Sequence, residues 1–368
     1  MKRSWFILVF SVLFGSLQAQ QKDVLKIVAV GDIMLGTAYP DNKLLPKYNV
    51  QRLFEPLQSY LQNSDVCFGN LEGALTDDLS QVKECRTDGR CYFFAMPTSY
   101  STNLKNAGFN VLSLANNHWN DFGYVGRKST KKSLRKEGIH FAGLQECPVD
   151  TFTLKGVKYG FCAFSANAGT MSLRDINNAT KIVKQLSSIS EVVLVSFHAG
   201  VEGPKGQNVT RGKETYIGEN RGNVYQFAHR MIDAGADILL GHGPHVTRAV
   251  EIYKNRFITY SMGNFCTYSC VSVAGLCGIA PLFQIYTNNK GEFLKAQIIP
   301  TYQQKFKAPR YDERKKVITV IQNLTKTDFP EMKDLIRISN DGWIELIDRN
   351  QEQRAKNQDK KQELQNSI

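Results

Sequence analysis

Four short and nearly continuous apolar segments place the strongest limits on how this chain can fold. They are IVAV at residues 27–30, VLSL at 111–114, VVLVS at 192–196 and DILL at 237–240. Strands of this kind suit a sheet that is covered on both faces. Helical stretches ending in Ala-Gly precede two of them, and a glycine there supplies the left-handed cap of a helix. The pattern therefore predicts an α/β fold.

Polar side chains follow these segments at the points where the strands should end. In open α/β sheets, ligands bind beyond the carboxyl ends of the strands, so we expect these side chains to share one rim. Residues that bind metals or move protons occupy these positions, namely Asp32, Asn117, His118, His198, His242 and His245, with Glu72 after a fifth segment, VCF at 66–68. Carboxylate, carboxamide and imidazole groups from five strand ends predict a metal centre.

The sequence GHGPH at residues 241–245 favours this interpretation. Gly241 and Gly243 let the backbone turn and approach other segments closely, and Pro244 stiffens the loop. The two histidines of the loop can then face one cation.

Each polar residue also has an ordinary explanation when it is considered alone. An Asp after a strand is commonly a turn residue, Asn116-Asn117 is typical of a turn, and a single histidine such as His198 is compatible with a buried core. Four of the six histidines, however, fall at strand ends. His140 and His229 lie in ordinary contexts, and we interpret both as structural.

The two ends of the chain differ from its body. Lys2 and Arg3, a short apolar run and Ala19 are typical of a secretory signal peptide over residues 1–19, because the run is too short for a membrane anchor. We therefore predict an exported, periplasmic or extracellular protein. Residues 349–368 form a polar tail that is either a solvated helix or disordered.

Charge and cysteine content narrow the partners and the compartment. The formal net charge of +12 favours an anionic ligand or envelope polymer, and the chain has no basic, aromatic stripe that would indicate nucleic acid. Eight cysteines in an exported chain can pair. We predict a Cys85–Cys91 bridge across a turn and a possible second bridge among Cys266, Cys270 and Cys277. Two others, Cys67 and Cys162, lie in apolar runs and are expected to be buried thiols.

Six motifs in order carry a family resemblance. GDIMLG, GNLEG, ANNHWNDFG, HAGVE, GHGPHV and YSMGNF resemble the CapA-type capsule-synthesis (poly-γ-glutamate capsule) family, which is related to the calcineurin-like metallophosphoesterases. The resemblance implies a four-layer α/β/β/α sandwich over residues 24–310. It also implies a centre with one or two divalent ions, for which mixed His, Asn and carboxylate ligands suit Mn, Fe or Zn.

Site roles carried over from the resemblance follow the motifs. Asp32 and His245 would bind a first metal, and Glu72 would bridge. Asn117, His198 and His242 would bind a second metal. His118 would act as a general acid or oxyanion donor, oriented by Asp121.

Three departures from the phosphoesterase pattern weaken the analogy. Met34 stands where that pattern has a histidine, and a thioether is a poor ligand for a hard or borderline cation. Glu72 replaces an Asp, and two residues rather than one separate the histidines of the closing loop.

Residues 201–222 predict a substrate loop above the rim. We expect Arg221, with Arg211, to contact an anion. Glu202 could orient a ligand, and Asn264 could be a donor to the site. Residues 311–348 predict an amphipathic helix and a hairpin around Asp341-Gly342, packed as an appendage on the same domain.

These features support one main hypothesis and two alternatives. The main one is an exported metal-dependent hydrolase of phosphoesterase type that acts on a capsular or envelope polymer. The alternatives are a non-catalytic accessory subunit of capsule assembly or export machinery and a metal-dependent amide hydrolase on γ-glutamyl links.

Overall fold

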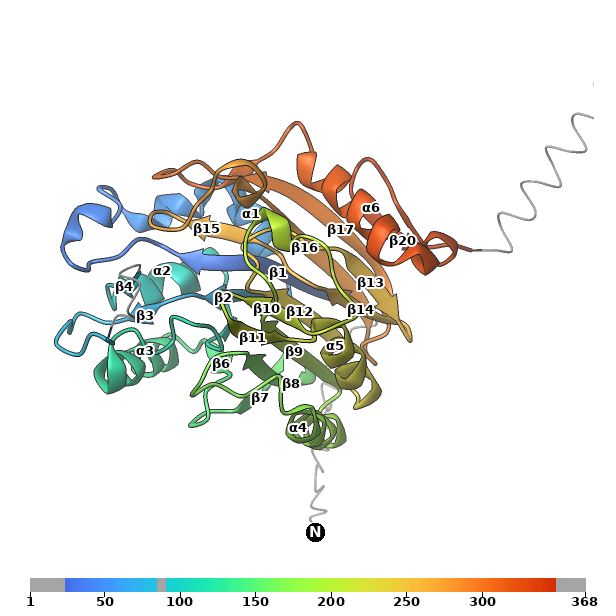
Figure 1. Cartoon of the computed structure of the whole chain (residues 1–368), viewed down its shortest axis with the longest axis horizontal. Helices are drawn as coiled ribbons and strands as arrows, with labels where there is room; N and C mark the ends of the chain where they lie inside the picture. Colours follow the sequence, from blue (N-terminus) through green and yellow to red (C-terminus); the bar gives the residue numbers. More distant parts are fainter. Residues whose placement is uncertain (1–23, 85–90, 349–368) are drawn as a thin grey trace, which may run out of the picture.

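A computed structural model describes residues 24–84 and 91–348 (Figure 1). Two sheets pack face to face, and helices cover their outer faces, which gives four layers in the order α/β/β/α. The predicted fold class is therefore confirmed. The predicted signal peptide, the polar tail and Cys85 lie outside the described residues, so the Cys85–Cys91 bridge stays a prediction.

The larger sheet has ten strands, and its parallel part positions the predicted rim. Parallel pairing links β1 (Val24–Met34), β2 (Val66–Leu71), β5 (Val111–Ser113), β6 (His140–Ala142) and β15 (Asn264–Thr267). Antiparallel strands complete the other side, namely β16 (Ile279–Asn288), β17 (Phe293–Tyr302), β18 (Arg310–Tyr311), β19 (Ile336–Ile338) and β20 (Trp343–Leu346).

The smaller sheet has six strands in the order β13-β14-β12-β9-β8-β7. Their bounds are β7 (Val149–Leu154), β8 (Val157–Ser165), β9 (Val192–His198), β12 (Ile238–His242), β13 (Val250–Tyr253) and β14 (Arg256–Thr259). The four central strands run parallel, with β9 between β8 and β12. Two short pairs lie outside the large sheets, β3 (Ala74–Leu75) with β4 (Ala95–Met96) and β10 (Glu214–Tyr216) with β11 (Glu219–Gly222).

Helices cover the outer face of each sheet. The large sheet carries α1 (Gln58–Gln62), α2 (Tyr100–Ala107) and α3 (Gly123–Lys136), and the small sheet carries α4 (Ile176–Ile189) and α5 (Val224–Asp233). Single 3-10 turns occur at Asn42–Leu44, Val50–Leu53, Glu55–Leu57, Pro204–Gly206, Gly275–Gly278 and Pro330–Asp334. No helix in the described part of the chain is long and apolar enough to cross a membrane.

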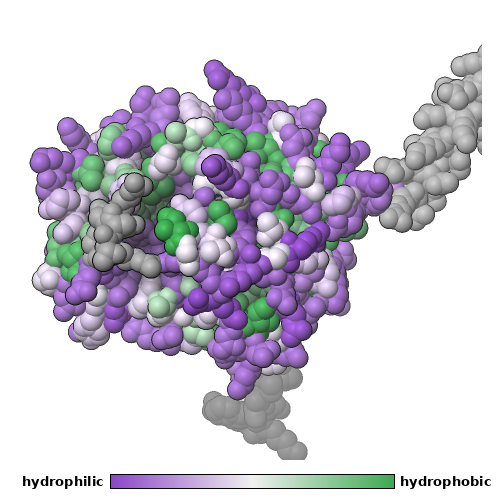
Figure 2. All heavy atoms as spheres, viewed as in Figure 1, coloured by the Kyte–Doolittle hydropathy of each residue, from purple (hydrophilic) through white to green (hydrophobic). Residues whose placement is uncertain are grey.

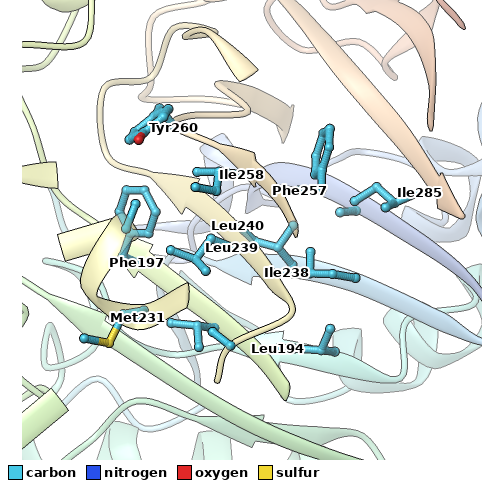
Figure 3. Close-up of a cluster of buried hydrophobic side chains, with 14 of the residues drawn as sticks. Leu194, Phe197, Met231, Ile238, Leu239, Leu240, Phe257, Ile258, Tyr260 and Ile285 are labelled. Carbon is cyan, nitrogen blue, oxygen red and sulfur yellow. The ribbon is translucent and has the colours of Figure 1, made fainter. Parts of the chain in front are cut away.

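The main core fills the space between the sheets and beneath α4 and α5 (Figure 3). Phe68 of the large sheet meets Phe161 of the small sheet at a centroid distance of 5.9 Å, and Phe283 meets Phe257 at 5.4 Å. Full burial of one such side chain contributes about 1.5–3 kcal/mol. Alternate residues of the large sheet face the other way, toward α1 and α2. This double coverage explains the uninterrupted apolar runs.

Residues 311–348 complete the sandwich at its edge. The predicted helix is α6 (Lys316–Asp328), and its face of Val317, Ile318, Ile321 and Leu324 is buried in the main core. The predicted hairpin is the β19–β20 pair, and β20 extends the large sheet beside β17. The segment thus shares both the core and a sheet with the preceding residues.

The cysteines in the described part of the chain correct one prediction. Cys266, Cys270 and Cys277 are all free, so the second bridge predicted among them is wrong. Cys266 lies on β15 and packs into the core beneath the large sheet, which directs its sulfur away from the loop. Cys67 and Cys162 are buried thiols as predicted, and burial raises the pKa of each above its usual range.

Candidate metal centre

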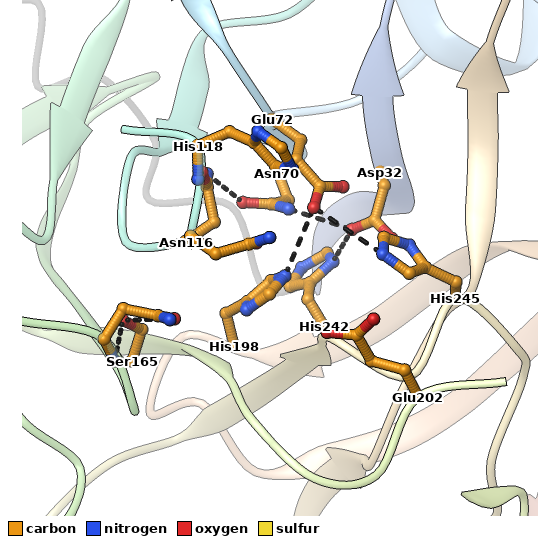
Figure 4. Close-up of polar contacts among 12 residues, drawn as sticks. Asp32, Asn70, Glu72, Asn116, His118, Ser165, His198, Glu202, His242 and His245 are labelled. Carbon is orange, nitrogen blue, oxygen red and sulfur yellow. Dashed lines mark hydrogen bonds and ion pairs between the residues drawn. The ribbon is translucent and has the colours of Figure 1, made fainter. Parts of the chain in front are cut away.

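Five strands from both sheets deliver polar side chains to one edge of the sandwich (Figure 4). The parallel strands β1, β2 and β5 end at this edge in the large sheet, and β9 and β12 end there in the small sheet. The β9–β12 register places His198 opposite His242, while Asp32 on β1 lies opposite Asn70. We call the six ligands predicted for this edge, Asp32, Glu72, Asn117, His198, His242 and His245, the rim cluster.

Asp32 is fully buried and orients two imidazoles of the cluster. One carboxylate oxygen lies 3.2 Å from Nδ1 of His242, and the other lies 3.0 Å from Nδ1 of His245. The amide of Asn70 also donates to Asp32 at 2.9 Å. Burial alone would raise the pKa of Asp32, but the hydrogen bonds from the two histidines outweigh it and hold that pKa well below its usual range. Both imidazoles are thereby fixed with Nδ1 toward the carboxylate.

Glu72 brings a second carboxylate to the centre of the cluster. One of its oxygens lies 3.5 Å from Nε2 of His198 and 3.8 Å from Nε2 of His245. Complete burial raises the pKa of Glu72 to about 7, although the charge of His245 opposes this shift. One ligand atom each from Asp32, Glu72 and His245 lies within 4.8 Å of the others.

The loop after β12 has a backbone conformation that requires glycine at the second glycine of GHGPH, Gly243. Gly243 has φ +112°, and a Cβ there would lie 2.7 Å from the backbone nitrogen of Ala199. His245 adopts φ +55°, a left-handed conformation that costs free energy in a residue with a side chain. Burial lowers the pKa of His245, but Glu72 and Asp32 outweigh it and raise the pKa to about 10. The strained turn therefore holds an imidazole against two carboxylates.

Asn264 on β15 holds His245 from behind. Its side-chain oxygen lies 3.1 Å from Nδ1 of His245, and its amide donates to the carbonyls of His245, Ser272 and Cys277. The side chain is 2% exposed. Both side-chain polar atoms of Asn264 are thus engaged within the fold, and the residue positions His245.

His118 lies beside the cluster, at the end of β5. Its Nδ1 is 2.7 Å from Asp121, and its ring stacks on Phe94 at 4.0 Å between centroids. The backbone amide of Phe94 and the ammonium of Lys83 also donate to Asp121. His118 and Asp121 are thus paired as the resemblance implied, and Nε2 is the ring nitrogen of His118 that Asp121 does not hold.

Several polar atoms of the rim cluster have no hydrogen-bond partner within the described residues. They are both carboxylate oxygens of Glu72, the side-chain oxygen of Asn117, both ring nitrogens of His198, and Nε2 of His242. A buried polar group left unsatisfied costs about 1–3 kcal/mol, so native proteins rarely tolerate such a concentration. Imidazole, carboxylate and amide atoms are the ligands of divalent transition metals. The residues present therefore fit a divalent cation.

Met34 does not add a ligand to this set. It is fully buried, and its sulfur lies 3.3 Å from the amide of Gly36. Because Met34 stands where the phosphoesterase pattern has a histidine, the first predicted metal keeps only Asp32 and His245 as ligands that it does not share with the second.

The predicted substrate loop divides into two parts. Arg221 on β11 is 2% exposed and pairs with Glu202 at 3.0 Å, and its charge reinforces the effect of burial in lowering the pKa of His198. Figure 4 shows Glu202 on the same side of the site as His245, and the charge of Glu202 contributes to the raised pKa of that histidine.

Arg211 contacts a different part of the molecule, which corrects its predicted role. It pairs with Glu331 at 3.1 Å, donates to the carbonyl of Asp328 and stacks on Tyr225 and Phe329. These contacts tie the loop to the C-terminal segment, so the loop follows a path that turns this side chain away from the rim.

The sequence analysis did not identify four residues that support the site, namely Asn70, Asn116, Lys83 and Phe94. Asn116 donates to Asn70 and to the Leu71 carbonyl, and its side-chain oxygen accepts from the His118 amide. Lys83 and Phe94 both donate to Asp121, the partner of His118. The Asn70 signal was present, since GNLEG carries an asparagine two residues before Glu72. Lys83 and Phe94 reach the site only through the tertiary fold.

The family comparison agrees with these motifs. The model of the bacterial capsule synthesis protein PGA_cap matches residues 26–269, more than half of the chain. The chain belongs to this family. It is 30% identical over 270 residues to the capsule biosynthesis protein CapA of Bacillus anthracis, which covers 67% of this chain and 60% of that protein's length. It is 26% identical over 283 residues to the PGA biosynthesis protein CapA of Bacillus subtilis, with 71% and 69% covered.

Two further matches carry less information. A probable polyglutamine synthesis accessory protein of Mycobacterium tuberculosis is 27% identical over 227 residues, with 55% of each chain covered. A putative 5'-nucleotidase structure from Staphylococcus aureus covers 85% of this chain and 59% of its own, at 12% identity and a TM-score of 0.39.

Proposed function

We propose that this chain is an exported, metal-dependent hydrolase of phosphoesterase type that acts in the biosynthesis of a capsular or envelope polymer. The observation that carries the proposal is the concentration of unpartnered, buried ligand atoms beside an oriented His118–Asp121 pair. The family membership supports the capsular context. An anionic polymer as substrate agrees with the formal charge of +12.

The rim cluster would hold one or two ions, with Mn, Fe or Zn suited to its ligands. When bound, such an ion lowers the pKa of water and polarises the bond to be cleaved. Asp32 fixes the tautomers of His242 and His245, so that each presents Nε2. Glu72, near Nε2 of both His198 and His245, would be one of the residues that hold the ions.

His118 would supply the proton that the leaving group requires. Its Nδ1 is held by Asp121, and the stacked ring of Phe94 covers one face of the imidazole and limits access of water. Proton transfer by a positioned side chain contributes about 10²–10⁴-fold to a rate.

A turnover assay on the metal-loaded chain without its predicted signal peptide tests the proposal. The substrates are a phosphomonoester, a phosphodiester and poly-γ-glutamate, of which the last reports amide cleavage. We expect His118→Ala to lower turnover at least about 100-fold, whereas the control His140→Ala retains it. His140 stacks on Phe152 and pairs with Asp150, outside the rim cluster. Full turnover in His118→Ala would contradict the assigned role.

A non-catalytic accessory role is the second candidate, and the burial of Met34 at a ligand position favours it. In that case the protein would bind anionic polymer, or contact capsule synthesis machinery, without turning over any of the three substrates. Polymer binding would then be the same in His118→Ala as in the wild type.

A further inference from the structure

Two buried arginines contact the chain segment that follows β9, and their hydrogen bonding differs. Arg248 is fully buried, and its guanidinium donates to both oxygens of Glu214 at 2.9 and 2.7 Å and to the carbonyls of Gly206 and Val201. Arg221 is 2% exposed, and its Nη1 pairs with Glu202 at 3.0 Å. Its Nε and Nη2 have no hydrogen-bond partner within the described residues.

The unpartnered donors of Arg221 form one functional unit. Nε and Nη2 lie on the same side of a guanidinium, and together they form the fork that binds a carboxylate or phosphate through two parallel hydrogen bonds. Glu202 occupies Nη1 and leaves this fork without an acceptor. A buried cationic donor without an acceptor costs free energy. The fold bears this cost at Nε and Nη2 of Arg221, which remain available to an incoming anion.

The position of Arg221 is fixed by its surroundings. The carbonyl of Arg221 accepts from the amide of Gly200, two residues after His198, at 3.1 Å. Glu214, at the start of the same hairpin, is clamped by Arg248 and accepts from the amide of Val201 at 2.8 Å. The hairpin is thus anchored to the strand end that carries a rim histidine. This anchoring holds the open fork of Arg221 in a defined place.

Charge also favours an anion beside Arg221. One divalent ion in the rim cluster would offset the carboxylates of Asp32 and Glu72, and a second ion would leave an excess of positive charge. Glu202 and Glu219 are the carboxylates that pair with Nη1 of Arg221, at 3.0 and 3.9 Å, and their side chains are 22% and 37% exposed. A negatively charged group that enters beside these partly exposed carboxylates would balance the charge of Arg221 and of the metal ions.

We infer that Arg221 is the anion-recognition residue of this site, and that its Nε and Nη2 bind a carboxylate or phosphate group of the substrate beside the metal centre. The inference rests on the proposed function and names the substrate class as one that bears an oxyanion. Glu202 is the resting partner of the guanidinium, and it competes with the incoming anion for the positive charge of Arg221.

Opposite effects of two variants test this inference. Titration calorimetry on metal-loaded protein, with the metal content of each sample measured, follows binding of inorganic phosphate and of a γ-glutamyl oligomer. We expect Arg221→Gln to weaken the responding probe about ten- to a hundredfold, and Arg221→Lys to weaken it less because the charge remains. Glu202→Gln should strengthen binding, since it removes the competing carboxylate. The probe that responds identifies the anion as phosphate or carboxylate.

If Arg221 and Glu202 form a purely structural ion pair, the two variants will not have opposite effects on anion binding. If Arg221→Gln and Glu202→Gln weaken binding equally, or if neither changes it while metal content stays at the wild-type value, the inference is overturned. It is also overturned if metal-loaded wild-type protein binds neither probe. Wild-type protein that takes up no metal would instead contradict the proposed function. Circular dichroism verifies the fold of each variant, and Arg221→Lys serves as the conservative replacement if Arg221→Gln does not fold.

Discussion

Two buried polar groups in this molecule use similar residues in different ways. The first, which we call the clamp, consists of Arg248 and Glu214 with the carbonyls of Val201 and Gly206, and each nitrogen of its guanidinium group has at least one acceptor. The second is the rim cluster, where most potential ligand atoms lack a hydrogen-bond partner within the described residues. Both are buried and charged, so burial does not distinguish them. The unused hydrogen-bonding capacity of the rim cluster distinguishes the two groups. It indicates that the rim cluster binds a ligand from outside the chain.

The clamp and the rim should respond oppositely to mutation. Removal of one partner from the clamp leaves a charge buried without compensation. Removal of the Glu72 carboxylate from the rim relieves a cost that the metal-free protein already bears. A site kept for function at the expense of stability has this property.

The largest expected effect is on the clamp. Arg248→Met should lower the free energy of unfolding by about 3–5 kcal/mol, because it leaves Glu214 buried and unpaired. Urea unfolding of the metal-free protein measures this loss. Arg221→Gln is the matched control and should cost less, since Arg221 pairs through Nη1 alone with two partly exposed carboxylates, Glu202 and Glu219. Equal losses of unfolding free energy in Arg248→Met and Arg221→Gln would contradict the distinction between the clamp and Arg221.

The second prediction concerns the rim and has a pH dependence of known sign. The pKa of Glu72 is raised to about 7 from the usual 4.5, so the folded state favours the protonated carboxyl. That stability is present below pH 4.5 and is lost as the pH rises through 7. At pH 8, Glu72→Gln should therefore stabilise the metal-free protein by about 3 kcal/mol, with a smaller gain at pH 5.

Thermal and urea unfolding in the presence of a chelator would measure this gain at both pH values. The same variant should lose metal affinity, because a carboxamide is a weaker ligand than a carboxylate. Destabilisation of the metal-free protein by Glu72→Gln at pH 8 would show that the rim is held together by its own contacts, as the clamp is.

The smallest expected effect lies outside both clusters. Arg211→Ala removes an exposed ion pair with Glu331 and the stacking on Tyr225 and Phe329, which together should cost about 1 kcal/mol. Metal content and anion binding should stay at wild-type values, as measured in parallel with Arg221→Gln. A loss of anion binding in Arg211→Ala would restore the substrate role that its contacts do not support.

The sequence predicted the strand ends well because their signal is local. An apolar run followed by Asp32, His198 or His242 defines both the strand and the residue at its end, and parallel pairing then brings such ends together. The four-layer arrangement came from the family resemblance rather than from the pattern of apolar residues. That pattern alone indicated only a covered sheet.

The supporting contacts could not be predicted because they depend on the paths of loops. Lys83 and Asp121 are 38 residues apart, and no local sequence pattern around either residue predicts their contact. Arg211 and Arg221 lie in one loop of similar composition, yet only Arg221 reaches the rim. Asn264 faces His245 because β15 adds to the large sheet beside β1, a pairing that links segments far apart in sequence.

Metal content is the most direct test of the central claim that the unpartnered atoms of the rim are metal ligands. Elemental analysis would be applied to the chain without its predicted signal peptide after loading with Mn, Fe or Zn, with His242→Ala as the test variant and His140→Ala as the matched control. We predict about one or two equivalents of metal in the wild type and in His140→Ala, and a clear reduction in His242→Ala. Absence of metal from the wild type after loading, or equal metal in both variants, would contradict the assignment.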